Sequence, residues 1–109
     1  GLVGSEMCIR DSVYLTSSNR VIERYRISQG GVTGTVVDHR LIVKRALELL
    51  ATQLILVHNH PSGNPHPSDD DRRLTQLIQK GAQTMNIRMI DHVIITDGLY
   101  YSFNDEGML

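Results

Sequence analysis

The stretch Leu54-Ile55-Leu56-Val57-His58-Asn59-His60-Pro61-Ser62-Gly63 leads an apolar run directly into two histidines and a loop. A short apolar run bounded by Pro and Gly predicts a buried β-strand, here over residues 53–58. Side chains two residues apart on a strand point to the same face, so the rings of His58 and His60 can converge on one ion. The sequence therefore predicts a strand that ends in two metal ligands.

The segment Ser68-Asp69-Asp70-Asp71, which follows the loop, is expected to supply a carboxylate as the third ligand. Two imidazoles and one carboxylate leave a fourth tetrahedral position for water, as in catalytic zinc sites. The segment also fits a structural role, because Ser68 and Asp71 have the spacing of a helix capping box. Ligation and capping use the same carboxylate, so the two roles could coexist only in part. The two histidines lead us to favour ligation.

The remaining patterns predict one domain in which two helices pack on a mixed sheet, an α/β or α+β sandwich. The other expected elements, in chain order, are a hairpin of residues 13–15 and 21–27, a short extended stretch at 35–37, a helix from Asp38 to about Ala51, a helix from Ser68 to Asn86, and a hairpin of residues 91–96 and 100–103. The side chains expected to face inward are Ile42, Ala46, Leu49 and Leu50 in the first helix and Leu74, Leu77, Ile78, Ala82 and Met85 in the second.

Composition excludes several classes of protein. The 109 residues, 40% of them apolar, suffice for one domain with one core. Apolar runs are far shorter than the roughly 20 residues that span a bilayer, so no membrane segment is expected. The single cysteine, Cys8, forms no intrachain disulfide, which favours a reducing cytoplasm. A net charge of −1 with scattered Arg and Lys gives no support for nucleic-acid binding.

His58, His60, Ser68 and Asp71 resemble the metalloprotease motif of the JAB/MPN superfamily, which reads His-x-His, seven residues, Ser, two residues, Asp. Within that superfamily, the surroundings resemble the bacterial RadC family over residues 13–109. The matching blocks are Asn-His-Pro-Ser-Gly after His58, Pro67-Ser68, Asp91-His92-Val93-Ile94-Ile95, Tyr101-Ser102-Phe103 and Glu106-Gly107.

The resemblance implies a JAB/MPN, cytidine-deaminase-like α/β/α fold, with a mixed sheet sandwiched by helices. It implies one Zn²⁺ held by His58, His60 and Asp71, with a metal-bound water that hydrolyses an amide bond in a peptide or protein substrate. The Ser68 hydroxyl would hydrogen-bond the tetrahedral oxyanion. The chain is thus expected to be a zinc metallopeptidase or isopeptidase. DNA repair is associated with the family's name, and no residue here argues for it.

One expected residue of the family is not found. The general-base glutamate precedes the first strand and aligns with Cys8, whereas Glu6 comes two residues early, a displacement of about 6.6 Å along a strand. The alternative function is therefore a catalytically silent metal-binding or interaction module. Residues 1–12 resemble a translated sequencing adaptor and lack an initiating Met, so we expect a non-native leader before a domain of residues 13–109.

Two other metal enzymes are excluded by the pattern. His58-Asn59-His60 matches the letters His-Asn-His by which a class of nucleases is named. In those nucleases, however, the three residues are spread over a ββα unit. This chain also lacks the basic surface that holds phosphates. A cytidine deaminase shares the fold but needs a Cys-x-x-Cys pair for its zinc. A chain with one cysteine cannot supply that pair.

Overall fold

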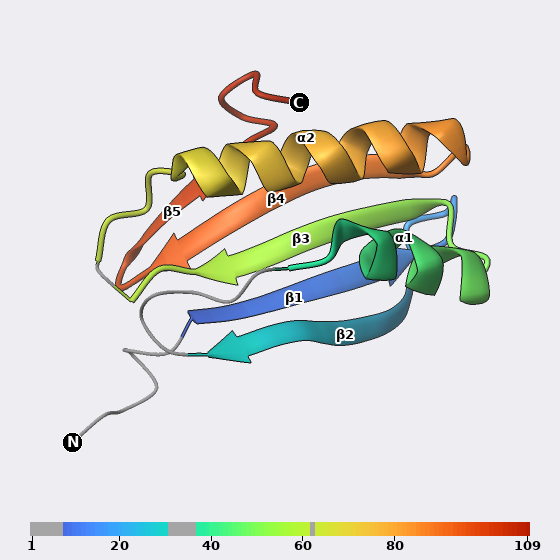
Figure 1. The fold of residues 1–109 in the computed structure, drawn as a ribbon, viewed down its shortest axis with the longest axis horizontal. Helices are drawn as coiled ribbons and strands as arrows, with labels where there is room; N and C mark the ends of the chain where they lie inside the picture. Colours follow the sequence, from blue (N-terminus) through green and yellow to red (C-terminus); the bar gives the residue numbers. More distant parts are fainter. Residues whose placement is uncertain (1–7, 31–36, 62) are drawn as a thin grey trace.

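The computed structural model describes residues 8–30, 37–61 and 63–109, and the fold is described for these residues. Five strands form one mixed sheet in the order β2-β1-β3-β4-β5 (Figure 1). The strands are β1 (Cys8–Leu15), β2 (Val21–Gly30), β3 (Gln53–Asn59), β4 (Arg88–Thr96) and β5 (Leu99–Ser102), and the helices are α1 (His39–Glu48) and α2 (Asp69–Thr84). The β3–β4 pair is parallel and the others are antiparallel. The predicted mixed sheet is confirmed.

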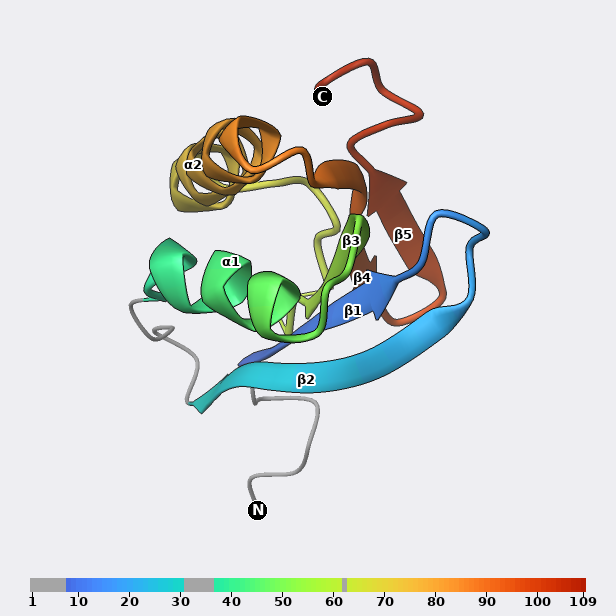
Figure 2. The ribbon, with the colours of Figure 1, turned by 90° about the vertical axis from the view of Figure 1, so that its right-hand side faces the viewer.

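The family resemblance implies helices on both faces of the sheet. In the described residues both helices lie on one face (Figure 2), so this part of the chain has two layers. Their contacts with the sheet enclose one core. Its fully buried side chains include Tyr14, Leu54, Ile42 and Ile78, which come from β1, β3, α1 and α2. The Tyr14 hydroxyl donates to the Ile42 carbonyl at 2.8 Å, and burial raises the pKa of this phenol to about 12.

The first hairpin is longer than the sequence predicts. β1 begins at Cys8 rather than at Val13, and its residues 10 to 15 pair with β3 as well as with β2. The polar residues Arg10, Asp11 and Ser12 conceal this extension, because they lack the apolar pattern by which a central strand is recognised. Of the short stretch predicted at residues 35–37, residues 35 and 36 lie outside the described residues.

Helix α1 ends earlier than the predicted Ala51, and three inward assignments are wrong. Leu50 is 85% exposed, and Leu77 and Met85 are also exposed, whereas Ile42, Ala46, Ile78 and Ala82 are buried. After α1, Leu50 has φ 53° and its N–H bonds the Leu47 carbonyl, while the Ala51 N–H bonds the Ala46 carbonyl. This Schellman ending turns the chain out of the helix, so Leu50 leaves the apolar stripe. Asn86, at φ 57°, ends α2 in the same way, as predicted.

Among the described residues, no helix is long and apolar enough to cross a membrane.

Candidate metal centre

The two histidines lie at the carboxyl end of β3. Burial alternates along this strand, and His58 shares the buried face with Leu54 and Leu56. His60 follows the strand's last residue and is tied to the sheet by its N–H, which donates to the Ile95 carbonyl at 2.9 Å. The ring centroids of His58 and His60 are 4.6 Å apart. The two rings converge as the strand spacing predicts.

Asp71 reaches the histidines from the first turn of α2. Its Oδ1 lies 3.1 Å from His58 Nδ1, and its Oδ2 lies 3.0 Å from His60 Nε2. The side chain is 1% exposed. Ser68 is the N-cap of α2: its hydroxyl oxygen accepts from the Asp71 N–H at 3.1 Å, and its own N–H donates to Asp71 Oδ2 at 2.8 Å. The predicted capping box therefore exists, and Asp71 Oδ1 takes no part in it.

The arrangement favours the charge states that metal ligands need. Burial lowers the pKa of His58, although contact with Asp71 opposes this shift, so the imidazole is neutral near neutral pH. Burial by itself would raise the pKa of Asp71, but hydrogen bonds from His58 and from the Ser68 N–H outweigh it and hold this pKa below the usual range. Neutral imidazole and ionised carboxylate are the forms that bind metal.

The ring orientation of His60 is fixed by a hydrogen bond at Nδ1, the ring nitrogen that does not face Asp71. Its Nδ1 lies 2.8 Å from the Asn64 carbonyl oxygen. A carbonyl can only accept, so Nδ1 carries the proton and Nε2 presents its lone pair toward Asp71. Metal-binding histidines usually have such a partner on the second ring nitrogen, because it fixes the tautomer.

Thr75 and His92, two buried side chains next to Asp71, are hydrogen-bonded to each other. The sequence did not predict this pair. The Thr75 hydroxyl donates to the Asp71 carbonyl at 2.8 Å and lies 2.6 Å from His92 Nδ1, which must therefore be the donor in that bond. Burial lowers the pKa of His92 to about 3, and its ring stacks on Phe103 with centroids 4.7 Å apart. The sequence feature that could have indicated Thr75 is its position four residues after Asp71, which places both residues on the same face of the helix.

The three predicted ligands form one compact group. The candidate ligand atoms of His58, His60 and Asp71 all lie within 4.8 Å of one another. Two nitrogens and one carboxylate oxygen at this separation fit the donor set of a divalent metal ion with an open position. These residues could therefore hold a metal ion.

The neighbourhood of the expected glutamate differs from the family pattern. Glu6 lies outside the described residues, and Cys8 is the first residue of β1. Two residues further on, Arg10 lies opposite His58 in the β1–β3 register, and its Nη2 is 3.9 Å from Asp71 Oδ1. The sequence pattern does not predict this arginine at the site, because it places the start of β1 only at Val13.

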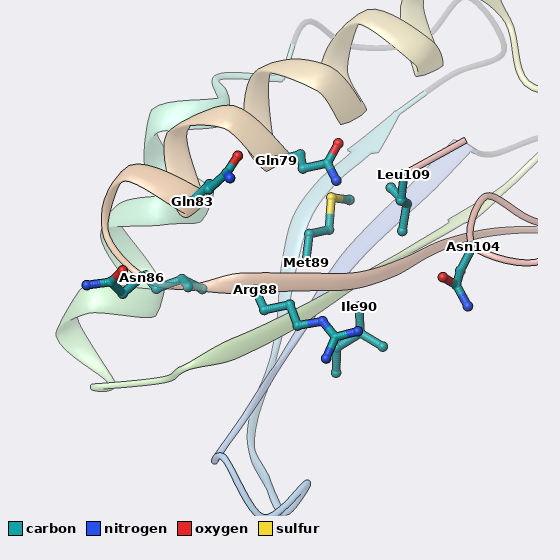
Figure 3. A pocket seen from close by; sticks show the side chains of 9 residues that line it. Gln79, Gln83, Asn86, Arg88, Met89, Ile90, Asn104 and Leu109 are labelled. Atoms are coloured by element: carbon teal, nitrogen blue, oxygen red, sulfur yellow. The ribbon is translucent and has the colours of Figure 1, made fainter. Parts of the chain in front are cut away.

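A separate pocket of about 450 Å³ lies between the carboxyl end of α2 and the start of β4 (Figure 3). It is lined by Gln79, Gln83, Asn86, Ile87, Arg88, Met89, Ile90, Asn104 and Leu109. The metal group adjoins the opposite end of α2, and a helix of 16 residues is about 24 Å long. The pocket is thus distinct from the candidate metal centre.

The fold and the His-His-Asp group define an α/β domain of JAB/MPN type with a candidate metal centre. The sequence profile described as "RadC-like JAB domain" matches residues 9–108, and the chain belongs to this RadC family.

Several relatives carry the name "UPF0758 protein". The chain is 47% identical over 96 residues to the one from Flavobacterium johnsoniae, covering 88% of this chain and 42% of the relative. For Porphyromonas gingivalis the identity is 48% over 96 residues, covering 87% and 42%. For Pasteurella multocida it is 40% over 108 residues, covering 99% and 48%. The chain therefore spans less than half the length of these relatives.

Proposed function

We propose that this chain is a zinc-dependent metallohydrolase that cleaves an amide bond in a peptide or protein substrate, as a peptidase or an isopeptidase. The observation that carries the proposal is the convergence of His58, His60 and Asp71, whose ligand atoms lie within 4.8 Å of one another. Imidazole and carboxylate ligands suit zinc, and three of them are typical of its catalytic sites. Membership of the RadC-like JAB family adds support.

His58, His60 and Asp71 would hold the zinc ion, which would make a water molecule more acidic and would polarise a carbonyl group. The chain's own contribution is to hold the ligands ready. His60 is oriented by the Asn64 carbonyl, and burial keeps His58 neutral. Asp71 is positioned by the helix cap, so the three ligands need little reorganisation.

Ser68 lies next to the candidate ligand Asp71. Its hydroxyl oxygen accepts from the Asp71 N–H in the capping box, and the hydroxyl also helps to lower the pKa of the Asp71 carboxyl. Ser68 is also solvent-exposed, which leaves it within reach of a substrate. We assign to this O–H the donation of a hydrogen bond to the substrate carbonyl oxygen as negative charge develops on it.

The second candidate function is a metal-binding or interaction module without catalysis. Two observations favour it: Cys8 occupies the position expected for the general base, and the metal group of the described residues contains no carboxylate besides Asp71. Without a positioned base, proton transfer from water loses a contribution that is typically about 10²- to 10⁴-fold. Any role in DNA repair is outside both proposals.

The substitution Cys8→Glu separates the two candidates. Hydrolysis of peptide and isopeptide substrates would be measured for the full chain with zinc and with a chelator. We expect Cys8→Glu to gain chelator-sensitive hydrolysis. The matched control Cys8→Gln, which has the same size but no basic carboxylate, should gain none. A Cys8→Glu protein that binds zinc yet stays as inactive as Cys8→Gln would support the non-catalytic module.

A further inference from the structure

Arg10 is a largely buried cation beside the candidate metal ligands. Its side chain is 14% exposed, and its Nη2 is 3.9 Å from Asp71 Oδ1. Its Nε and Nη1 are buried and have no hydrogen-bond partner among the described residues. Buried charges are normally paired and fully hydrogen-bonded, so this guanidinium is held in an unfavourable environment.

The backbone fixes the position of this arginine. Arg10 is paired with His58 across β1 and β3, in a register that runs without a shift from residue 10 to residue 15. By contrast, Arg24 and Arg26 are largely exposed, and both hydrogen-bond the Asp11 carboxylate. Arg10 therefore lies at the site because of its place in the strand, without a comparable hydrogen-bonded partner to retain it.

We propose that Arg10 competes with the metal ion for Asp71 and so makes this chain a weaker metal binder than its His58-His60-Asp71 geometry allows. This inference rests on the proposed metal-dependent function. An arginine does not lose its proton in proteins, so the competing charge persists at any working pH. Because Arg10 Nη2 is 3.9 Å from Asp71 Oδ1, an ion bound to this oxygen at about 2 Å would lie within about 6 Å of the arginine charge. Even with the full screening of water, a unit charge at about 6 Å opposes the binding of a divalent ion by about tenfold, and by more at shorter range.

Metal affinity tests the inference directly. The full chain would be titrated with Zn²⁺ against a chromophoric chelator, as wild type, Arg10→Met, Arg88→Met and His58→Ala. Methionine keeps much of the length of arginine but carries no charge. Arg88 is an exposed strand arginine at the other end of the sheet, and serves as the matched control. Arg10→Gln is a second neutral variant, should Arg10→Met fail to fold by circular dichroism.

We expect the neutral variants at position 10 to bind Zn²⁺ at least about tenfold more tightly than wild type. Arg88→Met should match wild type within about twofold, and His58→Ala should lose binding. Equal or weaker binding by the position-10 variants, with His58→Ala still defective, would overturn the role of Arg10 alone. Absence of Zn²⁺ binding in every protein, the neutral variants included, would overturn the proposed metal function and this inference with it.

Discussion

Replacing Thr75 by valine removes one hydroxyl from beneath the metal ligands and little else. Thr75 is 1% exposed, and its hydroxyl lies between the Asp71 carbonyl and His92 Nδ1, at 2.8 and 2.6 Å. Valine has nearly the same shape and a similar helix propensity. The substitution therefore leaves the His92 N–H buried without its partner.

The cost follows from that unpaired donor. A buried polar group that loses its partner costs about 1–3 kcal/mol, and we expect Thr75→Val to reduce the free energy of unfolding by this amount. In a domain of about this size, each kcal/mol lowers the melting temperature by about 4–8 °C. Thr84 provides the control, because its hydroxyl also donates to the carbonyl four residues earlier, at 3.0 Å, but on the exposed side of α2.

Urea unfolding of wild type, Thr75→Val and Thr84→Val measures the difference. We expect Thr84→Val to stay within about 0.5 kcal/mol of wild type, as most surface substitutions do. Equal stabilities of the two variants would refute the assigned role of the Thr75 hydroxyl. The comparison cancels the change in helix propensity, since both variants replace Thr by Val within α2.

Three further outcomes follow from the same structure. Ser68→Ala should lower the free energy of unfolding by about 1 kcal/mol through loss of the cap, and lower any metal-dependent turnover about 10²- to 10³-fold; unchanged turnover would remove Ser68 from the reaction. Ile78→Ala should cost about 2–5 kcal/mol in urea unfolding, and a cost no larger than that of Leu77→Ala, which is at an exposed position, would contradict the described core. Folding lowers the pKa of His92 to about 3 from about 6.5, so this residue adds stability above pH 6.5 that is lost as the pH falls below it. The free energy of unfolding should fall by up to about 1.4 kcal/mol per pH unit between pH 6 and pH 4, and His92→Asn should reduce this slope; an equal slope would contradict the assignment.

The sequence predicted most of the architecture because the relevant signals are local. Alternation in β3 and the Ser68 cap of α2 placed His58, His60 and Asp71 close together. The ends of the helices were harder to predict from the sequence. The left-handed conformation of Leu50 depends on the Schellman hydrogen bonds, and no glycine or asparagine marks it in the sequence.

Interactions between distant segments account for what the sequence could not show. Arg10 reaches Asp71 only because β1 pairs with β3, and Thr75 meets His92 only when α2 packs against β4. Neither pair has a spacing along the chain that predicts contact.

The non-native origin of residues 1–12 stays a prediction, as do a cytoplasmic location and a peptide or protein substrate. Sequencing the genomic locus tests that origin, and finding the same twelve codons there would contradict it.

The metal content of the purified, folded chain tests the central claim most directly. Elemental analysis would be run on wild type, His58→Ala and His66→Ala, the last replacing an exposed loop histidine. After loading with Zn²⁺ and removal of the excess, we predict about one zinc per chain in wild type and in His66→Ala, and little in His58→Ala. A folded wild-type chain with no more zinc than His58→Ala would contradict the metal centre and leave Ser68 and Asp71 as a helix cap.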